Sequence, residues 1–173
     1  LGNSLPVREV DFYGSGNGSE VKLGLNRGAS GIDGLVASSA GYSKGLNQPL
    51  TLLLGDLSLL HDLNSLKLIS ESPKPIVLIV LNNHGGGIFS FLPISEHKDI
   101  FETYFSTPHS LEFKDAAKMF KLPYFNPESP EEFESIYLKQ TSADKSCIIE
   151  VNTLKEDNIR VQKEWTEFLH QNR

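Results

Sequence analysis

Two short apolar runs, each followed at once by polar and glycine residues, most constrain how this chain can fold. The runs span residues 50–54 and 76–81, and Pro49 and Pro75 stand immediately before them. Continuous runs of Leu, Ile and Val of this length are typical of strands buried on both faces of a parallel sheet. The stretch between them, residues 59–70, is long enough for one helix. We therefore expect a right-handed strand-helix-strand unit.

The rest of the chain continues this alternation. Further helices are expected at residues 5–12, 36–41, 111–120, 130–140 and 155–170, and further strands at 21–25, 124–125 and 147–151. Strands that alternate with helices predict an α/β fold, here a doubly wound, mostly parallel sheet flanked by helices. In the last helix, Val161, Trp165, Phe168 and Leu169 recur at helical spacing, and we expect this stripe to pack on the core.

Composition narrows the class of protein. A chain of 173 residues with 39% hydrophobic content can bury one core without disulfides, so residues 1–173 are expected to form a single domain. The net charge of -6 and the lack of a basic run argue against nucleic-acid binding and favour a small-molecule partner. No apolar run approaches the roughly 20 residues that span a bilayer. Cys147, the only cysteine, lies in an apolar run and is predicted to be a core thiol.

The start of the chain carries neither a signal peptide nor an Arg-rich transit segment, and it begins with Leu1. We therefore expect an excised domain of a longer protein that is not secreted. The glycine-rich stretch at residues 14–19 does not match GxGxxG and precedes a predicted strand instead of following one. It is interpreted as a surface loop.

Polar groups follow both apolar runs at the point where each predicted strand ends. Asp56 follows the first run and Asn83 the second, 27 residues later. Parallel strands connected in this way end at the same edge of the sheet, where open α/β sheets bind ligands. Carboxylate, amide and backbone carbonyl oxygens suit Mg²⁺. The Gly85 carbonyl can turn toward the same ion, and the Ser58 hydroxyl can meet phosphate oxygens.

Each of these residues also has a purely structural alternative. Asp56 or Ser58 could simply cap the following helix, and Asn82 with Asn83 could simply form a turn. His84 lies beside the same turn and could act as an acid or base, but a solvent-facing turn histidine is the favoured interpretation. The combination of two strand-end sites with their glycines favours the metal and diphosphate interpretation.

The same segments resemble the signature of thiamine diphosphate enzymes, a GD-containing turn followed by NN at just under thirty residues. More narrowly, residues 26–34, 55–64 and 82–93 are similar to the cofactor domain of the MenD family, the 2-succinyl-5-enolpyruvyl-6-hydroxy-3-cyclohexene-1-carboxylate synthases. The resemblance covers nearly the whole chain, as the carboxy-terminal third of the family's subunit. Leu57 stands where many thiamine diphosphate enzymes have Gly, which disfavours the decarboxylase and acetolactate synthase branches.

The resemblance implies a role for each matching residue. Asp56, Asn83 and the Gly85 carbonyl would ligate Mg²⁺ or Mn²⁺. The residues implied in thiamine diphosphate binding are Ser58, Ile32, Gly55, Asn82 and Ile88, with Ile32 supporting the bent cofactor. Those implied in substrate binding are Arg27, Arg8, Phe89 and Leu92, the arginines as carboxylate clamps and the apolar pair as a wall.

The resemblance also implies a reaction and an assembly. The family decarboxylates 2-oxoglutarate and adds the remaining four-carbon unit to isochorismate in menaquinone or phylloquinone biosynthesis. Its activating Glu lies on a pyrimidine-binding domain of the neighbouring subunit, in a homodimer or tetramer. We therefore expect no catalytic acid or base in this chain and no activity from it alone. Bacterial relatives would be cytoplasmic and plant ones directed to chloroplasts.

Two alternatives remain open. The chain could belong to another thiamine diphosphate enzyme, such as an acetolactate synthase or a 2-oxoacid decarboxylase. It could also be a non-enzymatic flavodoxin-like or receiver-type module in which Asp56 accepts phosphate or is structural. A receiver is expected to show an acidic pair after its first strand and a Lys at a later strand end, and neither is found.

Overall fold

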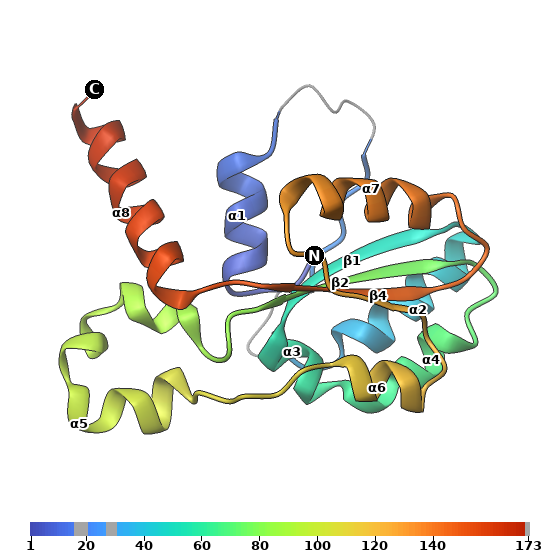
Figure 1. Cartoon of the computed structure of the whole chain (residues 1–173), viewed down its shortest axis with the longest axis horizontal. Coiled ribbons are helices and arrows are strands. Elements are labelled where there is room, and N and C mark those ends of the chain that lie inside the picture. Colours follow the sequence, from blue (N-terminus) through green and yellow to red (C-terminus); the bar gives the residue numbers. More distant parts are fainter. Residues whose placement is uncertain (16–20, 27–30, 172–173) are drawn as a thin grey trace.

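The centre of the molecule is a four-stranded parallel sheet (Figure 1). This computed structural model describes residues 1–15, 21–26 and 31–171. The strands are β1 (Leu50–Gly55), β2 (Ile76–Asn82), β3 (Tyr124–Phe125) and β4 (Cys147–Asn152). They lie in the order β1-β2-β4-β3, and every neighbouring pair is parallel. The predicted α/β class with a mostly parallel sheet is confirmed.

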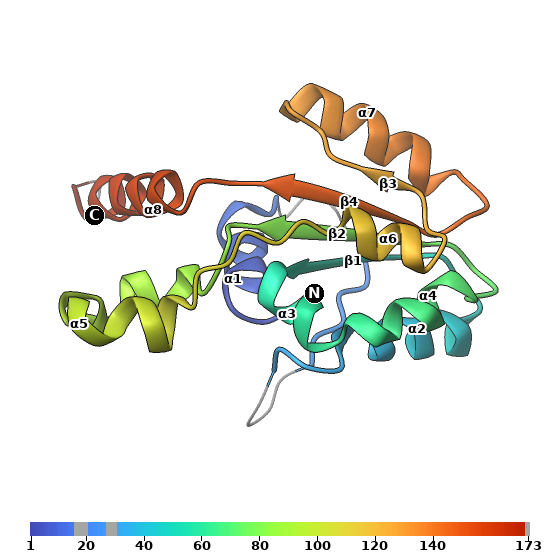
Figure 2. The same ribbon diagram turned by 60° about the horizontal axis from the view of Figure 1, so that its bottom comes forward.

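Helices cover both faces of this sheet (Figure 2). They are α1 (Leu5–Tyr13), α2 (Leu35–Leu46), α3 (Asp56–His61), α4 (Leu66–Ser70), α5 (Lys98–Phe101), α6 (Lys114–Met119), α7 (Pro130–Thr141) and α8 (Lys155–Gln171). Short 3-10 turns occur at η1 (Leu63–Ser65), η2 (Gly87–Phe91) and η3 (Pro93–Glu96), and η4 (Glu102–Ser106) is a π-helical turn. Helices α2, α4 and α6 lie on one face and α7 lies on the other.

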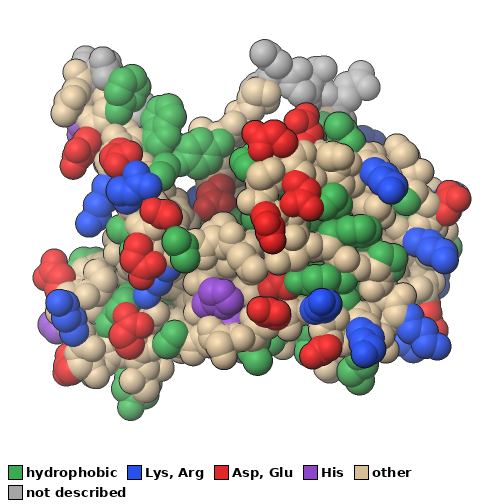
Figure 3. Space-filling model, viewed as in Figure 1, with side chains coloured by type: hydrophobic (Ala, Val, Ile, Leu, Met, Phe, Trp, Pro, Cys, Tyr) green, Lys and Arg blue, Asp and Glu red, His purple; other side chains and the backbone are tan. Residues whose placement is uncertain are grey.

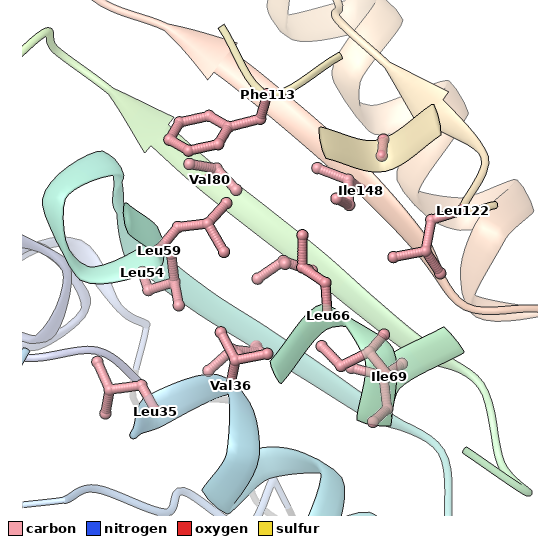
Figure 4. Close-up of a cluster of buried hydrophobic side chains, with 14 of the residues drawn as sticks. Leu35, Val36, Leu54, Leu59, Leu66, Ile69, Val80, Phe113, Leu122 and Ile148 are labelled. Carbon is pink, nitrogen blue, oxygen red and sulfur yellow. The ribbon is translucent and has the colours of Figure 1, made fainter. Parts of the chain in front are cut away.

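Alternation along the strands divides the core between the two faces. Leu54, Val80 and Ile148 point to the face covered by α2, α4 and α6, where they meet Leu66 and Phe113 (Figure 4). Each of these side chains is at most 2% exposed. Full burial of a Leu, Ile, Val or Phe side chain contributes about 1.5–3 kcal/mol, so this cluster is the main support of the sheet.

The opposite face holds a smaller cluster beneath α7. Val77, Ile79 and Ile149 pack there together with Cys147, against Phe133 and its neighbours on α7. The thiol is free and buried, and burial raises the pKa of Cys147 to about 11. The prediction of a core thiol on a strand is confirmed.

The expected helix over residues 59–70 is divided in two. It begins earlier, with α3 at Asp56, and it breaks at Asp62 before α4. The Asp62 carboxylate accepts a hydrogen bond from the Ser65 hydroxyl at 2.6 Å and from the Ala37 backbone N–H at 3.0 Å. Side-chain acceptors of this kind compete with the helical backbone pattern, and here they also fasten the break to α2.

The predicted strand at residues 21–25 is wrong. This segment has no regular secondary structure and pairs with no strand in the described part of the chain, and Val21, Leu23 and Leu25 are exposed. The outer edge of β1 is contacted instead by the amino terminus, because the Gly2 N–H donates to the Leu53 carbonyl at 2.6 Å. Most of the loop expected at residues 14–19 lies outside the described residues.

The expectation that the stripe on α8 packs on the sheet core is also wrong for Trp165 and Phe168, and the side chain of Leu169 lies outside what the structure describes. Helix α8 projects beyond the carboxyl ends of the strands, beside α1 (Figure 1). Trp165 is 41% and Phe168 55% exposed, and Trp165 makes an edge contact with Tyr13 of α1 at 6.3 Å between ring centroids. Figure 3 shows hydrophobic side chains on the surface of this projecting helix. No described helix combines the length and apolar character needed to cross a bilayer.

Candidate functional site

A cleft of about 950 Å³ opens where β1 and β2 end. Its walls are α1, the start of α3, the turn after β2, η2 and the first turns of α8. The predicted site residues that line it are Arg8, Ile32, Gly55, Asp56, Ser58, Asn83, Gly85, Ile88 and Phe89. The structure therefore brings together residues that span more than eighty positions of the chain, at the sheet edge where α/β folds bind ligands.

Asp56 is a buried carboxyl group at this cleft. It is 2% exposed. Its Oδ1 accepts the Leu57 backbone N–H at 2.6 Å, and its Oδ2 accepts the Gly85 N–H at 2.9 Å. His109 Nε2 lies 3.2 Å from Oδ2, without the alignment of a hydrogen bond. Burial raises the pKa of Asp56, while the two backbone donors and the nearby His109 and His84 oppose that rise.

The turn after β2, residues 83–87, is here called the glycine turn, and it approaches a neighbouring segment too closely for side chains. Gly85 has φ +147°, and a Cβ there would lie 2.4 Å from the Ser106 carbonyl oxygen. The Gly86 N–H donates to that same oxygen at 2.6 Å. Gly85 turns its N–H toward Asp56, and its carbonyl accepts the Gly87 N–H at 3.0 Å. The Gly85 carbonyl, which was expected to face a metal, therefore accepts a hydrogen bond within the turn, while the N–H of the preceding peptide donates to Asp56.

The two asparagines of the NN pair face different ways. Asn83 is half-buried and lines the cleft, where a Cβ on Gly87 would lie 2.4 Å from its Nδ2. Asn82 is fully buried and lies outside the cleft lining. Its Nδ2 donates to Glu150 Oε1 at 2.6 Å and to the Leu111 carbonyl at 3.0 Å. The structure places Asn82 beneath the glycine turn.

The remaining predicted residues differ in how closely they meet the cleft. Ser58 is buried in its wall, and Phe89 packs edge-on against Phe105 at 5.7 Å between ring centroids. Arg8 is exposed, and its Nη1 donates to the Ser4 carbonyl at 2.6 Å. Leu92 is 48% exposed and lies outside the lining. Arg27 falls outside the described residues.

Several residues of the site were not found by reading the sequence. Glu9 and Asn158 join α1 to α8 across the cleft, with 3.4 Å between Asn158 Nδ2 and Glu9 Oε1. His109 reaches Asp56 from a loop that carries no motif. His84 is half-buried instead of solvent-facing, and its ring meets that of His109 edge-on. Glu150 had a signal, since a charged residue interrupts the apolar run of β4.

The donor set at the cleft fits a hard divalent cation. Asp56 and Asn83 both border the cleft, and Mg²⁺ prefers such carboxylate and amide oxygens, usually together with phosphate and water. The described residues contain no cluster of three or more His, Cys, Asp or Glu that could hold a metal by themselves. A cation here would therefore depend on Asn83, on backbone oxygen and on a bound diphosphate in addition to Asp56.

Comparison with known proteins points to one group of enzymes, although no protein-family model matches the chain. Relatives named 2-succinyl-5-enolpyruvyl-6-hydroxy-3-cyclohexene-1-carboxylate synthase include those of Chlorobium phaeovibrioides (49% identical over 164 residues), Chlorobium phaeobacteroides (48% over 161) and Rubrobacter xylanophilus (48% over 162). The alignments cover 92% to 94% of this chain and 28% of each relative. The chain thus spans just over a quarter of the length of the curated relatives it matches.

A solved structure shares the fold. Benzoylformate decarboxylase from Polynucleobacter necessarius superposes with a TM-score of 0.58, over 72% of this chain and 23% of that one, at 19% identity. Likeness at this level of identity concerns the fold alone. The sequence relatives are far more similar, at 48% and 49% identity over 92% and 94% of this chain. The chain therefore belongs, as a segment matching about 28% of their length, to the 2-succinyl-5-enolpyruvyl-6-hydroxy-3-cyclohexene-1-carboxylate synthase family.

Proposed function

We propose that this chain is the domain that binds the diphosphate of thiamine diphosphate, together with Mg²⁺ or Mn²⁺, in a synthase that acts on 2-oxoglutarate and isochorismate. The observation that carries the proposal is the meeting of Asp56, Asn83 and Ser58 in one cleft at the strand ends. Family membership supports the assignment of cofactor and reaction. The proposal includes a multidomain parent enzyme whose pyrimidine-binding domain completes the site.

The metal would be held by Asp56 and the Asn83 side chain, with the Gly85 carbonyl as a further ligand. Both side chains border the cleft, and oxygen ligands of these kinds suit either ion. The Ser58 hydroxyl would bind the diphosphate. Ile32, Gly55 and Ile88 would contact the cofactor, since all three line the same cleft. Asn82 would act on this site by holding the glycine turn from below.

Thiamine diphosphate would supply the carbanion-stabilising chemistry that a decarboxylation of a 2-oxoacid requires. This chain would position and shield the reacting groups. Phe89 would exclude water from one wall of the cleft. Leu92, one turn further along the chain, would extend this apolar wall. Arg8 and Arg27 would bind substrate carboxylates, because a guanidinium forms paired hydrogen bonds with a carboxylate. The activating glutamate would come from the other domain, in a homodimer or tetramer.

The test is CO₂ release from 2-oxoglutarate by the complete polypeptide that carries this domain, with and without isochorismate, Mg²⁺ and thiamine diphosphate. Asp56→Ala is expected to lower isochorismate-stimulated turnover at least 100-fold, on the order expected when a main ligand of a catalytic metal is removed. Asp115→Ala, on the exposed face of α6, is the matched control and should retain wild-type turnover.

Three outcomes would change the proposal. A preference for a different 2-oxoacid would retain only the cofactor class and would favour another thiamine diphosphate enzyme. Activity that is independent of thiamine diphosphate would overturn the proposal. Full metal-dependent turnover in Asp56→Ala would remove Asp56 from the metal site.

A further inference from the structure

Glu150 is a fully buried carboxylate in the middle of β4, and it lies beneath the proposed site. It is 0% exposed. Its Oε1 accepts the Asn82 Nδ2–H at 2.6 Å, and its Oε2 accepts the Phe113 backbone N–H at 2.9 Å and the Tyr124 hydroxyl at 2.8 Å. Within the part of the chain that the structure describes, no Lys, Arg or His forms an ion pair with it. The donors to its two side-chain oxygens in this part of the chain are all neutral groups.

Through Asn82 the carboxylate reaches the glycine turn. The Asn82 Oδ1 accepts the His84 backbone N–H at 3.1 Å, so the same side chain joins Glu150 to the turn that carries Asn83 and Gly85. Its Nδ2 donates to Glu150 and the Leu111 carbonyl. Every polar atom of the Asn82 side chain is therefore engaged, and its orientation is fixed by partners on both sides.

Glu150 also fixes the segment on the other side of Asp56. The Phe113 N–H and the Leu111 carbonyl bind to Glu150 and to Asn82, respectively. These two residues end the loop that brings His109 Nε2 to 3.2 Å from Asp56 Oδ2, and the His109 N–H donates to the His84 carbonyl at 3.2 Å. One buried carboxylate thus holds two of the segments that surround the candidate metal ligands.

A carboxylate is the group that this arrangement requires. Burying a charge without an ion-pair partner costs free energy, and neutral groups can also fill a hydrogen-bonded core. An ionised carboxylate, however, accepts on both oxygens, and its bonds are stronger than those between neutral groups. A Gln in its place would present an NH₂ group to one set of donors, so that at least one donor would lose its acceptor.

We propose that Glu150 is a positioning residue for the metal site, which acts through Asn82 to hold Asn83 and Gly85 in their ligating arrangement. The inference rests on the proposed function, because it assumes that the glycine turn binds a metal. Partners that orient metal ligands typically change metal affinity by about 10- to 100-fold when they are removed.

The test measures Mn²⁺ binding by electron paramagnetic resonance in the complete enzyme with thiamine diphosphate present, and thermal unfolding of the same samples. Glu150→Gln is expected to raise the Mn²⁺ Kd at least tenfold at a temperature where the variant is folded. Tyr124→Phe is the matched control. It removes one donor from Glu150 but leaves the Asn82 bond, so its Tm should fall while its Kd stays within about twofold of wild type.

Asn82→Ala interrupts the same connection from the other end, and it carries the test if Glu150→Gln fails to fold. The effects of the two changes on the Mn²⁺ Kd should not add. The Kd of the double variant is expected to lie within about twofold of the higher of the two single-variant values. Additive effects, or an unchanged Kd in the folded single variants, would overturn the inference while wild-type binding upholds the metal site. Failure of the wild type to bind Mn²⁺, with Asp56→Ala indistinguishable from it, would overturn the proposed function and this inference with it.

Discussion

At the scale of single residues, three of the carboxylates in or beneath the cleft differ in the groups that stabilise their charge. Asp56 accepts two backbone N–H groups and lies beside an imidazole. Glu150 is satisfied by uncharged donors in the sheet. Among the described residues, Glu9 in the cleft wall on α1 accepts one long side-chain hydrogen bond, from Asn158. Of the three, Glu9 has the weakest described hydrogen bonding to stabilise its charge, so its ionisation should disfavour the folded state most.

The pH dependence of stability in the Glu9→Gln variant tests this expectation. Burial raises the pKa of Glu9 above its ordinary value, and the hydrogen bond from Asn158 only partly opposes this. The folded state therefore binds the proton more tightly than the unfolded one. The contribution of Glu9 to stability is full below about pH 4.3 and is lost as the pH rises through the raised pKa.

Gln keeps the shape of the side chain and can still accept from Asn158. The measurement is the free energy of unfolding of the 173-residue chain in urea. We expect the value for Glu9→Gln minus that for wild type to be about 0.5 kcal/mol larger at pH 7.5 than at pH 4.5, and small because solvent screens this partly exposed group. Glu134→Gln on α7, in the same protocol, controls for a general change in charge. A stability difference between Glu9→Gln and wild type that is the same at both pH values would contradict the prediction.

At the scale of elements, the sequence predicted the strands best where burial is continuous. The runs that became β2 and β4 are buried on both faces over most of their length, so their local composition and their place in the fold agree. Strand β1 is buried on one face only, at Leu52 and Leu54, and was still predicted because its run is almost entirely leucine. The polar residues at the strand ends were predicted together for the same reason, since parallel strands fix the edge at which they meet. Asp56, Asn83 and Ser58 line one cleft as this argument requires.

Prediction from the sequence failed where a contact between residues distant in the chain determines the local structure. Val21, Leu23 and Leu25 alternate like a strand, but Gly2 contacts the edge that they would need. The break at Asp62 depends on its bond to Ala37, which lies 25 residues away. His109 reaches Asp56 because Glu150 and the glycine turn hold its loop, and no local pattern shows this. Such positions depend on partners that are distant in sequence.

The amino terminus of α7 offers a prediction about a single element. The Ser129 hydroxyl accepts the Glu132 N–H at 3.1 Å, and the Glu132 carboxylate accepts the Glu128 N–H at 2.8 Å, with Pro130 at the first helical position. Ser129→Ala should lower the free energy of unfolding by about 1 kcal/mol, the usual cost of losing such a cap. Urea unfolding of the chain measures this.

Thr141→Ala is the control at the other end of α7. Its hydroxyl only donates back to the Leu138 carbonyl within the helix, so its loss should change stability by less than about 0.5 kcal/mol. Helix α7 lies on the sheet face away from α2 and α4, and none of its residues lines the cleft. An equal loss in both variants would show that the Ser129 cap does not stabilise α7.

At the scale of the whole molecule, one end is built unlike the rest. Around the sheet, apolar side chains are enclosed by helices on both faces. At the carboxyl ends of the strands, Phe12, Tyr13, Trp165 and Phe168 are all more than 40% exposed on α1 and α8. The cleft opens between these two helices and the glycine turn. The curated relatives are more than three times as long as this chain, which covers 28% of them.

This organisation predicts that the 173-residue chain alone binds the metal but does not turn over substrate. The protein ligands proposed for the metal all come from this chain and border its cleft, whereas the activating glutamate is proposed to lie on another domain. Isothermal titration with Mn²⁺ and thiamine diphosphate should detect binding that Asp56→Ala removes, and CO₂ release from 2-oxoglutarate should stay at the uncatalysed rate. The complete polypeptide, assayed in parallel, should be active. Turnover by the chain alone would contradict the prediction, and its loss in Glu9→Gln would then identify Glu9, which already lines the cleft, as the base.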